Sequence, residues 1–275
     1  MALTQKLVVG AEYDRAITTL ESDRRARSAF QDLAVRIAHP GALLYDFGAG
    51  TGIDARFYAE HGFTVGAYDV DPGMREHFAI ACRALIEAGR ISLDAGSYPQ
   101  FLSCTTLNGG RRADLITSNF APLNLITDLA RLFEKFHALA LPQGRVLASV
   151  LNPYFVGDLK YAWWWRNVLR LWRAGHYSVA GAQAPITRRR PADFARQCAP
   201  YFALTRVLPG LPGDGPQPEK GGNLDRGTHG SWLRLVTCRF IFLLFERRNV
   251  GNGNGADQRT PAIRRKAAEL FSSPS

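Results

Sequence analysis

A glycine-rich turn that begins with an acidic residue is the part of this chain best suited to chemistry. It reads Asp46-Phe-Gly-Ala-Gly-Thr-Gly52 and lies between an apolar run ending at Tyr45 and a helix-like segment over 53–60. Glycines between a strand and a helix allow a ligand to approach the backbone at the helix N-terminus. The spacing is not the G-x-G-x-x-G of dinucleotide-binding folds, because Ile53 stands where the third glycine would be. An acidic turn of this kind favours a cationic nucleoside ligand without a phosphate.

Polar residues recur after the next three predicted strands. Asp69 follows 64–68, Asp94 follows 91–93 and Asn119 follows 113–118, so each repeat of roughly 25 residues holds one strand and one helix. This rhythm predicts an α/β fold with a Rossmann-like, doubly wound and mostly parallel sheet. The carboxyl ends of parallel strands share one edge of the sheet, so we expect these side chains to converge on one crevice.

The arrangement resembles the class I S-adenosyl-L-methionine (SAM)-dependent methyltransferases of the small-molecule type, whose first motif reads [DE]-x-G-x-G-x-G. Asp46 to Gly52 matches this motif without a gap, and the resemblance covers about residues 10–155. It implies a seven-stranded sheet, SAM as the cofactor and S-adenosyl-L-homocysteine as the product.

The resemblance also implies a set of cofactor contacts. The glycine turn would lie against the methionine part of SAM, Asp69 would bind the ribose hydroxyls, Asp94 would face the adenine amino group and Asn119 would stand near the sulfonium. Asp71 is instead predicted to cap the helix that begins near Pro72. The complete set of expected cofactor-binding residues is Asp46, Gly48, Ala49, Gly50, Gly52, Asp69, Val70, Asp94, Ala95, Asn119 and Tyr13.

The chain divides into five predicted segments. Residues 1–40 form an N-terminal helical segment, and residues 41–151 form the SAM-binding Rossmann-like core. Residues 152–200 form a helical lid or substrate insertion after the fifth strand, and the strands of 201–248 complete the sheet. The tail, 249–275, is rich in glycine and charge and is predicted to be disordered.

The insertion carries a predicted helix over 158–174 with an unusual surface. One stripe of it is apolar at helical spacing, and arginines follow on another side. Three interpretations remain open: a helix packed on the core through its aromatic side chains, a lid that walls a lipophilic pocket, and a helix lying on an anionic membrane. The stripe consists of Tyr161, Trp164, Trp165, Val168, Leu169 and Trp172, and the arginines are Arg166, Arg170 and Arg173.

The insertion also supplies the candidates for the acceptor site. Its expected pocket residues are Tyr154, Trp164, Trp165 and Tyr177. His176 is the candidate general base for a hydroxyl acceptor, because histidine titrates near neutral pH. The fourth strand is followed by Ser118-Asn-Phe-Ala121, without the Asn/Asp-Pro-Pro-aromatic motif of enzymes that methylate planar amino groups. These features favour methyl transfer to a hydroxyl of a small lipophilic or aromatic metabolite.

Charge and composition leave two alternative functions open. The net charge of +10 suits an RNA methyltransferase, although no RNA-binding module is visible, so nucleic acid is not the expected partner. The second alternative is a non-catalytic SAM-binding protein that docks on a membrane or partner through its Trp/Arg helix. Four scattered cysteines favour reduced thiols and no metal site. Without an apolar run long enough for a spanning helix or a signal peptide, the expected location is the cytoplasm.

Overall fold

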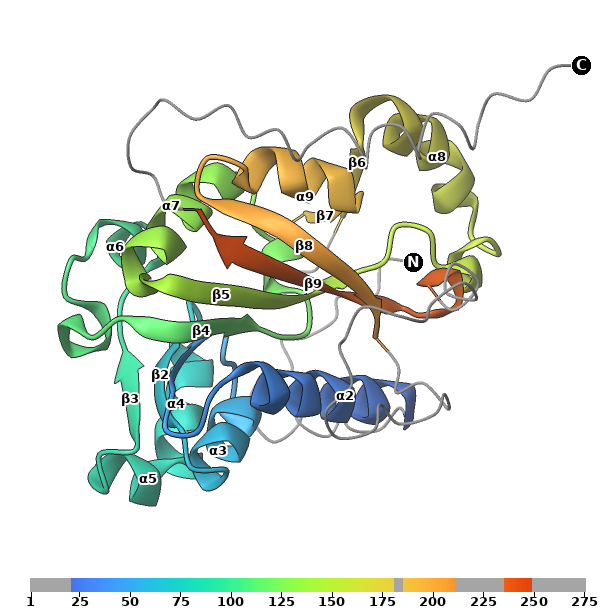
Figure 1. Cartoon of the computed structure of the whole chain (residues 1–275). Helices are drawn as coiled ribbons and strands as arrows, with labels where there is room; N and C mark the ends of the chain where they lie inside the picture. The colour runs from blue at the N-terminus through green and yellow to red at the C-terminus, as the bar shows by residue number, and fades with distance from the viewer. Residues whose placement is uncertain (1–20, 181–184, 211–234, 249–275) are drawn as a thin grey trace, which may run out of the picture.

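A computed structural model describes residues 21–180, 185–210 and 235–248. Tyr13 and the predicted tail, 249–275, lie outside the described residues. The described part of the N-terminal segment is a single helix, α2 (Glu21–Ile37), which Figure 1 shows beneath the sheet.

The centre of the molecule is a seven-stranded sheet in the order β3-β2-β1-β4-β5-β9-β8. The first five strands run parallel, and β9 is antiparallel to both β5 and β8. Because β1 lies between β2 and β4, the sheet changes winding direction there, which is where this class of sheet binds its ligands. The predicted fold is confirmed. The strands are β1 (Leu43–Phe47), β2 (Thr64–Tyr68), β3 (Ile91–Asp94), β4 (Ala113–Ser118), β5 (Ala140–Leu151), β8 (Phe202–Pro209) and β9 (Phe240–Arg247).

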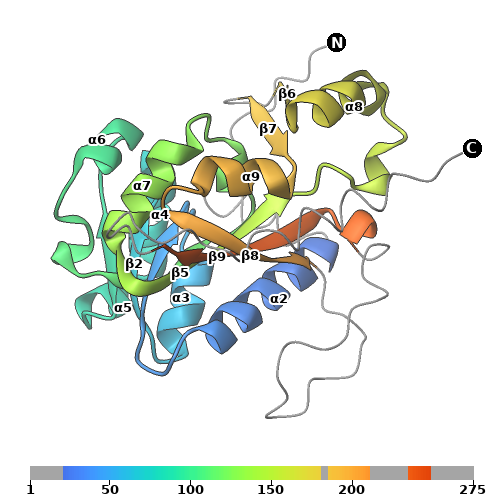
Figure 2. The ribbon, with the colours of Figure 1, turned by 45° about the horizontal axis from the view of Figure 1, so that its top comes forward.

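Helices cover both faces of this sheet. Two of them, α2 and α3, lie on one face, and α7 and α9 lie on the other, as Figures 1 and 2 show. Short 3-10 turns span Leu107–Gly110 (η1), Pro122–Asn124 (η2) and Val156–Asp158 (η3). The remaining helices of the core are α3 (Ile53–Glu60), α4 (Pro72–Ala81), α5 (Arg83–Glu87), α6 (Tyr98–Ser103), α7 (Leu129–Leu139) and α9 (Pro191–Cys198).

The strands divide the apolar interior into two cores. Alternate residues of a strand point to opposite faces, so Tyr45 and Phe47 join the core under α7, whereas Leu44 joins the core under α2 and α3. Asp46 has the parity of Leu44 and therefore faces the α2 and α3 side. Strand alternation thus places the acidic residue of the glycine motif beneath these two helices.

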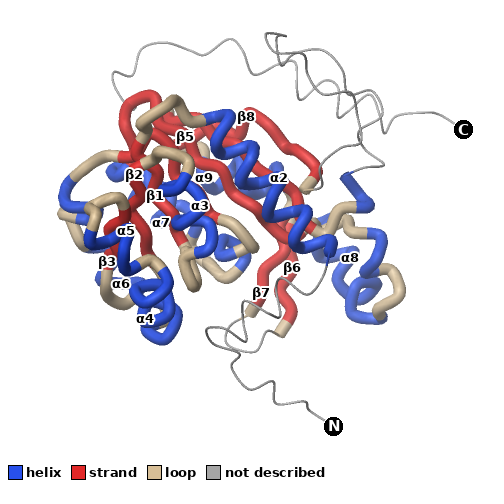
Figure 3. Tube along the Cα trace, turned by 90° about the horizontal axis from the view of Figure 1, so that it is seen from below, coloured by secondary structure: helices blue, strands red, loops and turns tan. Residues whose placement is uncertain are grey.

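The insertion after β5 is only partly helical. Its helix α8 (Ala162–Ala174) begins four residues later than the predicted start at 158, after η3, and is followed by an antiparallel hairpin of β6 (His176–Val179) and β7 (Ile186–Arg189). This hairpin was not predicted from the sequence. Figure 3 shows α8 beside β6 and β7, at the edge of the molecule and away from the parallel strands.

The first of the three interpretations of the apolar stripe, packing on the core, does not hold for most of its residues. Trp165 is 59% exposed and Trp172 is 74% exposed, and Tyr161 and Leu169 are exposed as well. The buried residue of this helix is Leu171, on the side turned toward the domain. The helix therefore packs on the domain through a narrow face around Leu171 and leaves a broad apolar face in solvent.

Candidate functional site

The glycine turn after β1 needs glycine for its own backbone and packing. Gly48, Gly50 and Gly52 have φ angles of 76°, 56° and 89°, a region that side chains disfavour. A Cβ on Gly48 would lie 2.5 Å from Cγ of Pro122, and one on Gly52 would lie 2.8 Å from Sγ of Cys82. The turn therefore fits closely between the end of β1, η2 and α4.

The backbone N–H groups of this turn donate hydrogen bonds to acceptors within the protein. Those of Gly48 and Ala49 donate to the carbonyl oxygen of Tyr68 at 2.8 and 3.0 Å, and that of Gly50 donates to Oδ2 of Asp69 at 2.8 Å. A phosphate-binding turn would direct such donors at its ligand. Their internal use agrees with the expectation of a ligand without a pyrophosphate.

Asp69 links the end of β2 to the glycine turn. It is 8% exposed, and its Oδ1 accepts the N–H of Asp71 at 2.9 Å. Burial raises the pKa of its carboxyl above the ordinary value. Each carboxylate oxygen has a second lone pair that can accept a ligand hydroxyl. The neighbouring Val70 is exposed.

The prediction that Asp71 caps a helix is confirmed. Its Oδ1 accepts the N–H groups of Gly73 and Met74 at 2.8 and 3.0 Å, at the N-terminus of α4. The carboxylate of Asp71 is therefore used to cap α4, whereas that of Asp69 is bonded to the glycine turn.

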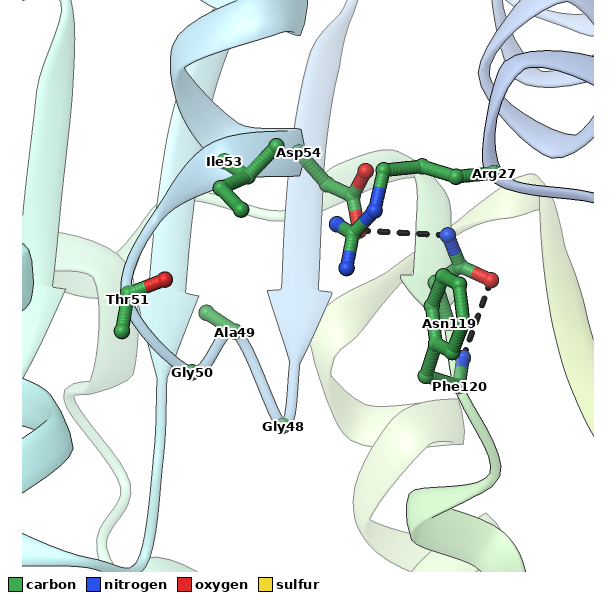
Figure 4. A pocket seen from close by; sticks show the side chains of 9 residues that line it. All are labelled: Arg27, Gly48, Ala49, Gly50, Thr51, Ile53, Asp54, Asn119 and Phe120. Atoms are coloured by element: carbon green, nitrogen blue, oxygen red, sulfur yellow. Dashed lines mark hydrogen bonds and ion pairs between the residues drawn. The ribbon is translucent and has the colours of Figure 1, made fainter. Parts of the chain in front are cut away.

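A buried polar cluster lies beside this turn and is centred on Asp54, the second residue of α3. Its carboxylate accepts hydrogen bonds from Arg27 and Gln31 of α2, each at 2.7 Å, and from Nδ2 of Asn119 at 3.2 Å. Figure 4 shows Arg27, Asp54 and Asn119 turned toward one another above the glycine turn. Asn119 was predicted from the sequence, whereas Arg27, Gln31 and Asp54 were not. The one sequence signal for them was an acidic residue, Asp54, two positions after the end of the glycine motif.

Asp46 is a buried carboxylate with one unsatisfied oxygen. It is 2% exposed, and its Oδ1 accepts a hydrogen bond from Oγ1 of Thr117 at 3.0 Å, whereas Oδ2 has no partner among the described residues. Burial, together with repulsion from the Asp54 carboxylate, raises the pKa of Asp46 to about 8. A cation placed at this oxygen would stabilise the ionised form.

The turn after β4 has an uncommon backbone. Phe120 and Ala121 have φ angles of 59° and 69°, and such left-handed non-glycine residues often occur at functional sites. Oδ1 of Asn119 accepts the N–H of Phe120 at 2.9 Å, and the ring of Phe120 lies 4.4 Å from Cζ of Arg27. Arg27 and Phe120 thereby line one side of a small pocket. Its other lining residues are Gly48, Ala49, Gly50, Thr51, Ile53, Asp54 and Asn119.

Asp94 already has partners within the protein. Its carboxylate accepts hydrogen bonds from the Tyr45 hydroxyl at 2.8 Å and from the N–H of Asn108 at 2.9 and 3.1 Å. It thus joins the middle of β1 and the end of β3 to η1, and the next residue, Ala95, is exposed. Contact between Asp94 or Ala95 and an adenine stays a prediction.

The structure does not bring the predicted acceptor-site residues into the pocket beside the glycine turn. Nδ1 of His176 lies 3.3 Å from Oδ2 of the buried Asp193. Tyr177 is buried in the same hairpin, whereas Tyr154 is exposed. Trp164 donates weakly to the carbonyl oxygen of Pro153 at 3.4 Å. Among the residues that the structure describes, no three His, Cys, Asp or Glu side chains are placed to hold a metal ion.

Comparisons with known proteins agree with this geometry. A family model described as a methyltransferase domain matches residues 20–184, more than half of the chain. No curated protein gives a significant match. The 1,6-didemethyltoxoflavin-N1-methyltransferase of Burkholderia thailandensis, solved with 1,6-didemethyltoxoflavin and S-adenosylhomocysteine bound, is 17% identical, with a TM-score of 0.56 over 86% of this chain and 84% of that one.

Two further structures give the same result. A SAM-dependent methyltransferase from Mesorhizobium loti is 19% identical, with a TM-score of 0.52 over 81% of this chain and 100% of that one. A putative methyltransferase in complex with the Haloferax volcanii Trm112 activator is 15% identical, with a TM-score of 0.56 over 87% and 96%. The chain therefore belongs to the methyltransferase-domain family and has the Rossmann-like fold of the class I SAM-dependent methyltransferases.

Proposed function

We propose that this protein transfers the methyl group of SAM to a small-molecule acceptor. The observation that supports this most strongly is Asp46, a buried carboxylate whose Oδ2 has no hydrogen-bond partner among the described residues, next to a glycine turn whose N–H groups are used internally. Such a site suits a ligand with a cationic amino group and no phosphate. Bound SAM supplies an activated methyl group on a sulfonium, and the protein has to orient the acceptor and exclude water.

We infer that different described residues would contact different parts of SAM. Asp69, with a free lone pair on each oxygen, would accept hydrogen bonds from the ribose hydroxyls. Asp46 is buried and does not line the pocket, so its carboxylate would attract the ammonium group of the methionine part through its charge. Arg27, which lines the pocket, would offer hydrogen bonds to the carboxylate of the methionine part. Asn119 bridges Asp54 and the Phe120 backbone, and so fixes the wall of the pocket after β4.

The first prediction concerns Asp69. We expect Asp69→Asn to weaken the binding of both SAM and S-adenosylhomocysteine about 10- to 100-fold, because hydrogen bonds to charged groups are each worth about 1.5–3 kcal/mol. Isothermal titration calorimetry on the full chain measures this. Asp32→Asn, which removes an exposed carboxylate of α2, is the matched control and should bind like the wild type. A wild-type protein that binds neither molecule would refute the proposed function.

We further propose that the acceptor is a lipophilic or aromatic hydroxyl compound and that His176 is its general base. The proximity of Nδ1 of His176 to the Asp193 carboxylate, at 3.3 Å, supports this role, because a nearby carboxylate stabilises the imidazolium that a general base forms. The turn after β4 is also not the Pro-Pro motif suited to planar amino groups. Asp193 in turn is held by Arg196 and Gln197, so its position is set by α9.

The second prediction tests His176. With an acceptor found by screening phenols and aliphatic alcohols for S-adenosylhomocysteine formation, His176→Gln should lower kcat about 100-fold and leave the SAM affinity unchanged. His39→Gln, at an exposed histidine, is the control. Turnover with amines or thiols alone would contradict the hydroxyl assignment.

A further inference from the structure

A cluster of large apolar side chains is exposed around α8. Of the large apolar side chains recorded as exposed in the described residues, only Val70, Ile80 and Leu125 lie outside 154–172. Contiguous exposed apolar surface of this kind marks an interaction site, whereas single exposed residues do not. We use the name aromatic face for Tyr161, at the N-cap of α8, together with Trp165, Leu169 and Trp172 of the helix.

Helical geometry makes the aromatic face continuous. At 100° per residue its four side chains fall within an arc of about 80°. The buried Leu171 projects on a different side, toward the domain. The three views of the fold agree that α8 stands at the periphery, beside the hairpin of β6 and β7. The aromatic face therefore does not contribute to the core of this domain.

A row of arginines borders the aromatic face along one side. Arg166, Arg170 and Arg173 are exposed, and none of them forms an ion pair with a described residue. The one acid of 154–175 is Asp158, which is buried and paired with Arg188. The surface is thus apolar and cationic, with no negative charge of its own.

This charge pattern selects among the partners that could cover the face. Two copies of α8 packed against each other would bring six arginines together without a carboxylate, which is unfavourable. A membrane with anionic lipids offers a hydrocarbon layer for the apolar side chains and phosphates for the arginines. Trp and Tyr are suited to the boundary between these layers, and the indole N–H of Trp165 is satisfied by the carbonyl oxygen of Leu159 at 2.8 Å.

We propose that α8 docks this protein on the surface of a membrane that contains anionic phospholipids. The aromatic face enters the boundary between head groups and acyl chains, and the three arginines bind the phosphates around it. The helix lies on the membrane, since no helix in the described part of the chain is long and apolar enough to cross one. This inference goes beyond the proposed methyl transfer and does not depend on it.

Vesicle co-sedimentation of the full chain tests the proposal. The vesicles contain phosphatidylcholine with about one third phosphatidylglycerol, or phosphatidylcholine alone. We expect binding to the anionic vesicles, at least tenfold weaker binding to the neutral ones, and a marked decrease as salt rises from low to physiological concentration. Quenching of tryptophan fluorescence by brominated lipid should accompany binding, because Trp165 and Trp172 enter the bilayer boundary.

Two variants of α8 separate the apolar and electrostatic contributions. Trp165→Gln with Trp172→Gln should weaken binding to anionic vesicles at least tenfold and abolish the quenching. Arg166→Gln, Arg170→Gln and Arg173→Gln together should weaken it by a similar factor and remove most of the salt dependence. All of these side chains are exposed, so the variants should keep the wild-type circular dichroism spectrum and thermal midpoint.

Matched controls use the same substitutions elsewhere on the surface. Ile80→Gln with Leu125→Gln removes two exposed apolar side chains, and Arg83→Gln with Arg112→Gln and Arg131→Gln removes three exposed arginines. Both controls should bind vesicles within about twofold of the wild type. Equal loss in controls and α8 variants would overturn the proposal, as would wild-type protein that stays in the supernatant. A dimer in solution that the tryptophan variant dissociates would assign the face to a second copy instead.

Discussion

Asp54→Ala is expected to lower the free energy of unfolding by about 3 kcal/mol. The substitution leaves the Arg27 guanidinium, whose side chain is 13% exposed, without its carboxylate, and removal of one partner from a buried ion pair typically costs about 3–5 kcal/mol. Gln31 and Asn119 lose their acceptor as well, which adds an unsatisfied amide donor from each side of the pocket. Urea denaturation followed by circular dichroism measures the change.

A double-mutant cycle shows whether the effect belongs to the pair. Arg27→Ala and Asp54→Ala should together cost at least 1 kcal/mol less than the sum of the single changes, because neither charge is then left alone. Asp32→Ala, on the solvent side of α2, should change stability by less than about 0.5 kcal/mol. Additive effects within about 0.5 kcal/mol would show that the contact between Arg27 and Asp54 does not hold α2 against α3.

The segment from β1 to Asp69 could be predicted from sequence because the patterns that define it are local. An apolar strand, a glycine motif and a helix follow each other within a few residues, and the cap at Asp71 depends on the second and third residues after it. The repeated strand and helix then fix the direction of the sheet, since parallel strands need a crossover each time. Local patterns therefore gave both the fold class and the place of the glycine turn.

The polar cluster could not be predicted in the same way. Arg27 and Gln31 meet Asp54 only because α2 folds back over α3, and 23–27 residues of sequence separate these partners. The same limit applies to Asp94, which the motif assigns to a ligand and which the fold uses for Tyr45 and Asn108. A carboxylate at a strand end looks alike in sequence whether a ligand or the protein binds it.

The helix α8 shows a second reason why part of the structure could not be predicted from sequence. A stripe of apolar residues at helical spacing predicts an amphipathic helix, and α8 is one, but spacing does not say which side is covered. Leu171, outside the predicted stripe, is the buried residue, whereas Trp165 and Trp172 are exposed. The hairpin of β6 and β7 determines this orientation by packing against α8, and four-residue strands are too short to give a clear alternation signal.

Asp46→Asn is expected to make the ligand-free protein more stable at alkaline pH. The pKa of Asp46 is raised from its ordinary value of 3.8 to about 8, so folding takes up a proton between these values, and the stability that depends on this group falls as pH rises through that window. Asparagine has no charge to bury. The variant should therefore exceed the wild type by on the order of 2 kcal/mol at pH 8.5, with a difference that shrinks toward pH 5. Urea denaturation at both pH values measures this.

The same substitution should have the opposite effect on ligand binding. Calorimetry should show SAM bound about 10- to 100-fold more weakly by Asp46→Asn, because the neutral amide cannot attract the ammonium group as a carboxylate does. The control is Asp32→Asn, which should change neither property. A variant that gains stability and keeps full SAM affinity would show that the charge of Asp46 does not act on the ligand. Opposite signs would identify the buried charge as a cost to the fold that is recovered only when the cationic ligand binds.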